Sequence, residues 1–213
     1  MILEKERIAV VEYGKKLVST GLVKGTFGNI SIYNREQNLM AISPSGKDYF
    51  ETTPEDIVVL SLEGEIVDGT CKPSSEYDLH RIFYQRRRDI NAVVHTHSTY
   101  ATILSCLQWE IEPVHYLIAY AGDKIPCTPY VPFGSYELAE AAYETMGDRY
   151  CCLLGNHGLL ACGSSIAYAF DVAEQMEFVS ELYYKAKSVG EPKLIAMEYL
   201  SGLMEKFKTY RVR

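Results

Sequence analysis

The fold of this chain is constrained most by short apolar runs that are joined in pairs by tight turns. The run at 57–62 turns back into 66–67, and the very apolar segment 150–154 turns back into 159–162. Two apolar runs joined by a short turn are typical of a β-hairpin, whose strands are antiparallel. Because such hairpins alternate irregularly with helical stretches, the sequence predicts an α/β layered domain with a mixed or antiparallel sheet. A doubly wound parallel sheet is disfavoured.

The remaining elements follow from apolar spacing and capping residues. Helices are expected at 3–20, 75–88, 98–107, 165–188 and 197–210, and further strands at 29–33, 38–43 and 91–96. Ser75 is the expected N-cap of its helix, with Asp78 as the capping-box residue. The chain has 213 residues without a repeat or a long linker, so residues 1–213 are expected to form one domain.

Composition and charge narrow the classes of partner. The chain carries 21 Lys and Arg against 28 Asp and Glu, a net charge of −7, so no nucleic-acid partner is expected. No run of about 18 apolar residues occurs and the first residues are charged, so neither a membrane partner nor a signal peptide is expected. The six cysteines include no C-x-x-C pair and are expected to be reduced and mostly buried, which favours a cytoplasmic location.

Three histidines carry the strongest chemical signal. His95 and His97 follow the apolar run 92–94, and residues i and i+2 of a strand face the same side. His157 lies in a tight turn between two apolar runs, where a hydrogen bond to a carbonyl is the simpler interpretation. Three neutral imidazoles with an open fourth position are typical of a catalytic zinc site. His80 lacks this pairing and is expected on the surface or satisfied in the core.

Three turns rich in small residues form the second signal. Ser74 and Ser75 precede a helix, where successive N–H groups attract an anion, and Glu76 follows directly. A simple helix cap is the alternative for this segment. Gly28-Asn29 and Ser45-Gly46 offer similar small-residue turns. Together they predict a phosphate held by amides and hydroxyls, without an obligatory Lys or Arg.

The order of these motifs resembles the class II aldolase/adducin family over nearly the whole chain. The resemblance rests on Gly28-Asn29-Ile30-Ser31, Ser43-Pro44-Ser45-Gly46, Pro73-Ser74-Ser75-Glu76, His95-Thr96-His97, Val114-His115-Tyr116 and Gly155-Asn156-His157-Gly158. It implies a three-layer αβα sandwich with a mixed, largely antiparallel central sheet. It also implies a homotetramer with sites at subunit interfaces.

The resemblance further implies a zinc-dependent aldolase that cleaves a ketose 1-phosphate, most closely L-fuculose 1-phosphate, into dihydroxyacetone phosphate and L-lactaldehyde. An enediolate stabilised by one zinc ion per subunit would be the intermediate. Glu76 would be the fourth metal ligand without substrate and the acid/base with it. Tyr116 would act on the aldehyde oxygen from a neighbouring subunit. The implied metal ligands are His95, His97, His157 and Glu76; the implied phosphate contacts are Gly28, Asn29, Ser45, Gly46, Ser74 and Ser75; Phe133 and Tyr210 would line and close the aldehyde pocket.

Other functions remain open at this point. A pentulose-phosphate 4-epimerase of the same family would use the same metal but carries Asp at the position of Glu76. A sugar-phosphate dehydratase would fit the same scaffold. An adducin-like binding module lacks the metal ligands that this chain retains. A cupin could supply a similar histidine pattern, but cupins are nearly all strand.

Overall fold

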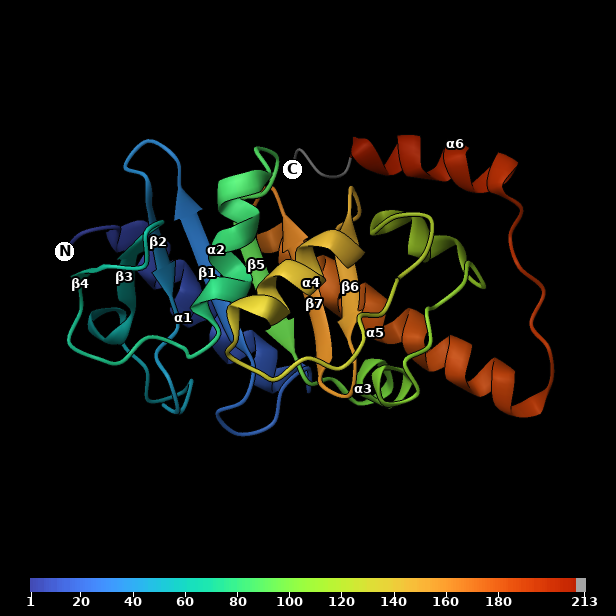
Figure 1. The fold of residues 1–213 in the computed structure, drawn as a ribbon, viewed down its shortest axis with the longest axis horizontal. Helices are drawn as coiled ribbons and strands as arrows, with labels where there is room; N and C mark the ends of the chain where they lie inside the picture. Colours follow the sequence, from blue (N-terminus) through green and yellow to red (C-terminus); the bar gives the residue numbers. More distant parts are fainter. Residues whose placement is uncertain (210–213) are drawn as a thin grey trace.

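The protein is built on one seven-stranded sheet with the strand order β4-β3-β2-β1-β5-β7-β6 (Figure 1). The computed structural model describes residues 1–209. The strands are β1 Asn29–Asn34, β2 Leu39–Ile42, β3 Val58–Ser61, β4 Ile66–Asp68, β5 Ala92–Thr96, β6 Cys151–Leu154 and β7 Gly158–Gly163. All neighbouring strands run antiparallel, and an isolated parallel bridge joins Cys127 to Leu153. The mixed or antiparallel sheet predicted from the hairpins is confirmed in its antiparallel form.

Helices cover both faces of the sheet, which gives the expected three-layer αβα sandwich (Figure 1). They are α1 Glu4–Ser19, α2 Tyr77–Arg86, α3 Thr99–Cys106, α4 Tyr136–Met146, α5 Ile166–Val189 and α6 Met197–Lys208, with the 3-10 turns η1 Pro54–Asp56 and η2 Tyr116–Tyr120. Helices α1, α3 and α5 pack on one face, and α2 and α4 pack on the other. In the described part of the chain, no helix is both long and apolar enough to cross a bilayer.

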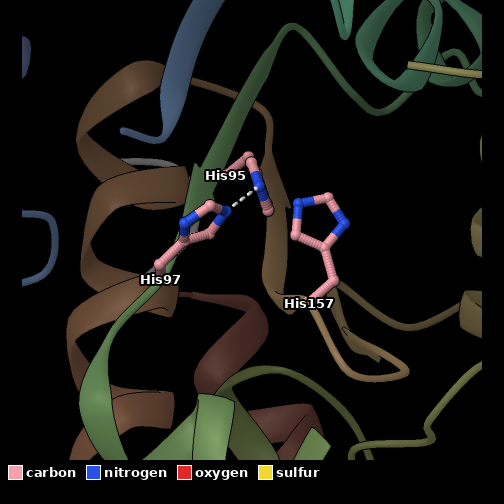
Figure 2. Close-up of side chains that lie close together, drawn as sticks. All are labelled: His95, His97 and His157. Atoms are coloured by element: carbon pink, nitrogen blue, oxygen red, sulfur yellow. Dashed lines mark hydrogen bonds between the residues drawn. The ribbon is translucent and has the colours of Figure 1, made fainter. Parts of the chain in front are cut away.

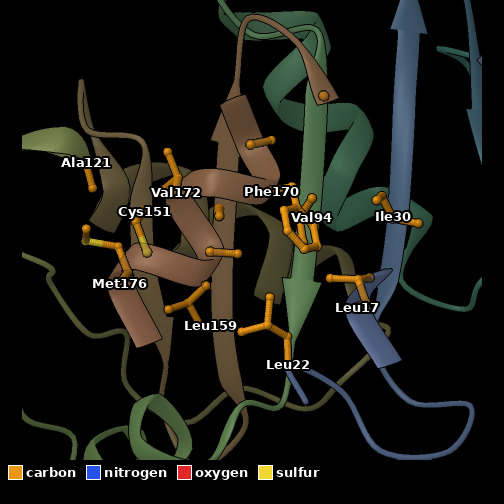
Figure 3. Close-up of a cluster of buried hydrophobic side chains, with 14 of the residues drawn as sticks. Leu17, Leu22, Ile30, Val94, Ala121, Cys151, Leu159, Phe170, Val172 and Met176 are labelled. Carbon is orange, nitrogen blue, oxygen red and sulfur yellow. The ribbon is translucent and has the colours of Figure 1, made fainter. Parts of the chain in front are cut away.

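Each face of the sheet buries its own hydrophobic core. Figure 3 shows the first, where Leu17 of α1 and Phe170 of α5 pack near Val94 of β5. Val93 belongs to the second core, under α2 and α4. Because side chains alternate along a strand, His95 points to the same face as Val93. The sheet therefore directs the His95 side chain toward the layer that contains α2.

The start of α2 differs from the predicted one. The helix begins at Tyr77 with Glu76 as its N-cap, and no side chain caps it. The Ser74 hydroxyl instead accepts a hydrogen bond from the Glu76 N–H at 3.3 Å, and Asp78 pairs with Arg81. The predicted Ser75–Asp78 capping box is therefore wrong, because a serine turn ahead of the helix already satisfies the first N–H group.

Helix α4 is a further difference, since apolar spacing predicts no element at 136–146. Ser135 caps it by accepting a hydrogen bond from the Leu138 N–H, and Leu138, Ala142 and Met146 are buried. Of these residues Ala142 is small and Met146 is flexible, so the apolar stripe is weak. The cysteines are free as expected, with Cys151, Cys152 and Cys162 buried and Cys106 exposed.

Candidate active site

The three predicted histidines come together at one end of the sheet (Figure 2). His95 lies near the end of β5, and His97 directly follows the last residue of that strand. His157 lies in the turn between β6 and β7. Their ring centroids are 4.7 to 5.0 Å apart, and one nitrogen from each ring lies within 4.8 Å of the others. The cluster that the sequence predicted is confirmed as a geometric unit.

Close backbone packing brings the hairpin turn to β5. Strand β7 pairs with β5 so that Leu160 lies opposite His95. A Cβ on Gly158 would lie 2.3 Å from the Thr96 carbonyl oxygen, so only glycine allows this approach. Asn156 takes a positive φ of 56° to close the turn. His157 is thereby carried over the end of β5.

Burial holds the three imidazoles in the neutral form. His95 Nδ1 lies 3.0 Å from the Leu159 carbonyl, which accepts, so Nδ1 carries the proton and Nε2 is bare. His95 Nε2 lies 2.9 Å from His97 Nε2. Burial and the neighbouring His157 lower the pKa of His97 to about 4, and burial lowers the pKa of His95 and His157 as well. Neutral imidazoles are the form that binds a metal.

Glu76 completes the cluster from the N-cap of α2. Its Oε2 lies 3.4 Å from His95 Nε2, and its Oε1 lies 3.5 Å from His157 Nε2. Oε1 is buried, and within the described residues it has no hydrogen-bond donor. A buried carboxylate oxygen without a donor, beside neutral imidazole rings, is costly unless a cation joins them. The donor set of three nitrogens and a carboxylate therefore fits a divalent cation such as zinc.

A cavity of about 450 Å³ opens directly from this cluster. Its lining includes these residues predicted from the sequence: Gly28, Asn29, Ser45, Gly46, Ser74, Ser75, Glu76, Phe133, His97 and His157. Phe27 and Tyr130 also line it, and sequence patterns did not single them out. Among the described lining residues none is Lys or Arg, so an anion bound here would rely on N–H and hydroxyl groups.

Two of the small-residue turns are fastened to each other. The Ser45 N–H donates to the Lys72 carbonyl at 2.9 Å, and the Ser74 N–H donates to the Ser43 carbonyl at 3.1 Å. These bonds bring turns 44–46 and 73–75 to the same wall of the cavity. Their convergence could not be read from spacing alone, because turn 44–46 follows β2 whereas turn 73–75 lies between β4 and α2.

The Asn29 side chain is already engaged. Its Nδ2 donates to Glu76 Oε2 at 3.0 Å, and its Oδ1 lies 2.5 Å from His80 Nε2. Because an amide NH₂ group has two hydrogens and Glu76 accepts one, an anion contact with the Asn29 side chain would use the second N–H. His80 is fully buried and hydrogen-bonded, so of its two expected placements, on the surface or in the core, the core placement is the one observed.

The chain matches the model of the class II aldolase and adducin N-terminal domain over residues 8–184. It belongs to this family. The chain is 55% identical, over 99% of both proteins, to a 5-deoxy-D-ribulose 1-phosphate aldolase of Bacillus thuringiensis serovar kurstaki. It is 36% identical, again over 99% of both, to an L-fuculose phosphate aldolase of Escherichia coli. A solved structure of an L-fuculose 1-phosphate aldolase superposes with a TM-score of 0.94 at 44% identity, covering 96% of each chain. The chain is thus a class II aldolase of the fuculose-phosphate aldolase superfamily.

Two residues that the family resemblance implies for the aldehyde side are not among the described residues that line this cavity. Tyr116 begins η2, is 48% exposed and does not line the cavity. Tyr210 lies outside the described residues. Within one aldolase chain the candidate site therefore comprises the imidazole cluster, Glu76 and the small-residue turns.

Buried neutral histidines make the metal-free aldolase sensitive to acid. Burial lowers the pKa of His80 from 6.5 to about 3, so the folded chain resists a proton that the unfolded chain accepts. Below pH 6.5 each such histidine costs about 1.4 kcal/mol of unfolding free energy per pH unit, until the folded pKa is reached. Denaturant unfolding of chelator-treated protein between pH 7 and 4.5 measures this slope. His80→Gln is expected to flatten it, whereas His115→Gln, at a partly exposed site, changes it less. An unchanged slope in His80→Gln contradicts the expectation.

Proposed function

We propose that this aldolase cleaves a ketose 1-phosphate between C3 and C4, which releases dihydroxyacetone phosphate and an aldehyde. The observation that carries the proposal is the single cavity that joins the imidazole cluster and Glu76 to the turns at 28–29, 44–46 and 73–75. One end of a substrate would meet groups suited to a phosphate, while the other would meet groups suited to proton transfer.

The histidines and Glu76 would have different roles in this reaction. His95, His97 and His157 would hold one zinc ion, with Glu76 as a fourth ligand before substrate binds. The ion would supply Lewis-acid stabilisation of negative charge on the substrate oxygens. In the condensation direction the Glu76 carboxylate takes the proton from C3 of dihydroxyacetone phosphate, and in cleavage it returns that proton to C3. The buried Oε1, which has no donor in the described structure, is available for this transfer.

We favour 5-deoxyribulose 1-phosphate as the substrate, because the relative that bears that name is 55% identical over 99% of both chains. Its cleavage gives acetaldehyde. L-Fuculose 1-phosphate, which gives L-lactaldehyde, is the second candidate; relatives named for it are 36% and 44% identical. The two substrates differ by one CHOH unit beyond the bond that breaks.

A panel of phosphorylated ketoses tests the proposal. Purified protein is offered 5-deoxyribulose 1-phosphate, L-fuculose 1-phosphate and L-ribulose 5-phosphate, and dihydroxyacetone phosphate release is followed by a coupled assay. The highest kcat/KM is expected for 5-deoxyribulose 1-phosphate. A higher value for L-fuculose 1-phosphate overturns the substrate assignment. Epimerisation of L-ribulose 5-phosphate without triose release overturns the aldolase proposal.

Ser75 is exposed at the cavity wall and tests the phosphate site. Since a phosphate bound equally in ground and transition states lowers KM without raising kcat, Ser75→Ala is expected to raise KM more than it lowers kcat. Steady-state kinetics with the phosphorylated ketose measures the split. Ser19→Ala, at an exposed serine on α1, is the matched control. An unchanged KM in Ser75→Ala would place the anion elsewhere.

We further propose a homotetramer in which Tyr116 of one chain reaches the cavity of the next. Tyr116 is exposed, and the aromatic rings of Phe27, Tyr130 and Phe133 are 64%, 60% and 72% exposed around the cavity. Large exposed aromatic groups of this kind mark surfaces that another chain can cover. A cytoplasmic location stays a prediction.

Subunit mixing measures whether the site is shared. Glu76→Gln and Tyr116→Phe chains are each expected to have low activity. In randomly mixed rings roughly a quarter of the sites would combine an intact Glu76 with an intact neighbouring Tyr116, so activity is expected to rise accordingly. Native mass spectrometry checks that subunits exchange. Two low-activity parents that exchange subunits without any rescue would contradict shared sites.

A further inference from the structure

A buried hydrogen-bonded row runs behind Glu76, along the contact between α2 and β1. Glu76, His80 and Tyr84 follow one another at intervals of four residues, and Asn29 and Ser31 at an interval of two. Four helical residues rise about 6.0 Å and two strand residues about 6.6 Å, so the two series stay in step. All five residues are less than 8% exposed.

The contacts in this row are close and continuous. Asn29 Nδ2 lies 3.0 Å from Glu76 Oε2, and Asn29 Oδ1 lies 2.5 Å from His80 Nε2. On the other side of the ring, His80 Nδ1 lies 2.7 Å from Ser31 Oγ. The Tyr84 hydroxyl lies 2.6 Å from Ser31 Oγ and 3.1 Å from the Ser31 carbonyl.

One arrangement of protons satisfies the side-chain contacts from Glu76 to Ser31. A carboxylate accepts and cannot donate, so Asn29 presents its NH₂ group to Glu76 and its Oδ1 to His80. The facing His80 Nε2 must therefore carry the proton. Burial lowers the pKa of His80 to about 3, so the ring is neutral and Nδ1 is an acceptor. The Ser31 hydroxyl then donates to Nδ1, and the Tyr84 hydroxyl directs its one proton to the nearer acceptor, Ser31 Oγ.

We propose that His80 is a positioning residue for proton transfer by Glu76: its Nε2–H holds the Asn29 amide in the one orientation that donates to the Glu76 carboxylate. This inference rests on the function proposed above. Asn29 fixes Oε2 and leaves Oε1, which has no donor in the described structure, for the proton. Without the His80 donor, Asn29 can turn its Oδ1 toward the carboxylate, and two acceptors then repel each other.

The three histidine ligands do not depend on this row. His95 is oriented by the Leu159 carbonyl at 3.0 Å, and neither His97 nor His157 contacts His80 through a hydrogen bond among the described residues. Loss of the His80 donor should therefore slow proton transfer while the metal content stays near that of the wild type. This separation makes the row testable.

The test compares His80→Leu, which removes the donor, with His80→Gln, which retains an N–H at a similar reach. Exchange of the C3 proton of dihydroxyacetone phosphate with deuterated solvent reports the Glu76 step. His80→Leu is expected to lose about 10–100-fold in exchange rate with KM little changed, and His80→Gln is expected to recover most of the loss. Ile82→Val, a buried change on the same helix, controls for loosening of α2. His80→Leu should add little to Asn29→Ala, because both remove the same support.

Each outcome decides one point. Wild-type protein without exchange would overturn the proposed function itself. If the wild type exchanges the C3 proton and His80→Leu does so at the same rate, the positioning role is overturned and the proposed function stands. Equal impairment of His80→Leu and His80→Gln, or losses additive with Asn29→Ala, would reduce His80 to a packing residue and overturn the inference. If His80→Leu fails to fold, imidazole ¹⁵N spectra of the wild type decide: an Nε2–H tautomer is expected, and Nδ1–H contradicts it.

Discussion

Glu76→Gln is expected to lower aldol turnover by about 10²–10⁴-fold, the usual contribution of a general acid or base. The side chain keeps its volume and lies at the N-cap of α2, where it makes no capping bond, so the fold should survive. The three imidazoles remain, so most of the metal should be retained. Deuterium exchange at C3 of dihydroxyacetone phosphate, measured by NMR, isolates the step.

Two further variants sharpen this prediction. In the wild type, Asn29 Nδ2 lies 3.0 Å from Glu76 Oε2. Glu76→Asp keeps the charge but moves the carboxylate away from Asn29, so a loss of exchange rate between those of the wild type and Glu76→Gln is expected. Glu144→Gln removes a charge at an exposed position of α4 and should leave exchange unchanged. Exchange at the wild-type rate in Glu76→Gln would remove this carboxylate from the role of base.

The reactive cluster was accessible from sequence because local rules place its parts. The i, i+2 spacing puts His95 and His97 on one side of a strand in any sheet, and the turn at 155–158 holds His157 at a strand end. The hairpins likewise predicted antiparallel pairing. These inferences need only backbone periodicity and turn chemistry, both encoded within a few residues.

The hydrogen-bonded row behind Glu76 depends on how α2 lies over β1, which no local rule sets. The intervals between Glu76, His80 and Tyr84 are visible in the sequence, but a helix displaced by one turn would pair them differently. Packing of Ile82 and Phe83 against the second core fixes that displacement. Because this placement is tertiary, the sequence left His80 open between the surface and the core, and its contact with Asn29 could not be predicted.

Removal of a metal ligand is expected to have the other large effect. His97→Ala should lose most of the bound metal and at least about 10²-fold in turnover, since Lewis-acid stabilisation contributes several kcal/mol. Elemental analysis of purified protein measures the metal, with about one ion per chain expected for the wild type. Since a ligand that binds only the folded state stabilises it, chelation should lower the melting temperature of the wild type but not of His97→Ala.

His115→Ala provides the matched control, because His115 lies outside the cluster and caps η2 through a contact with the Leu117 N–H. Its metal content should equal that of the wild type. Metal-stripped wild type with full turnover would refute the metal site. The identity of the ion follows from a reconstitution series: three nitrogen donors favour Zn²⁺ or Co²⁺ over the oxygen-preferring Mg²⁺. Restoration by Mg²⁺ alone, at concentrations where Zn²⁺ fails, would contradict zinc, because a site built from neutral imidazoles offers a hard cation too few oxygen ligands.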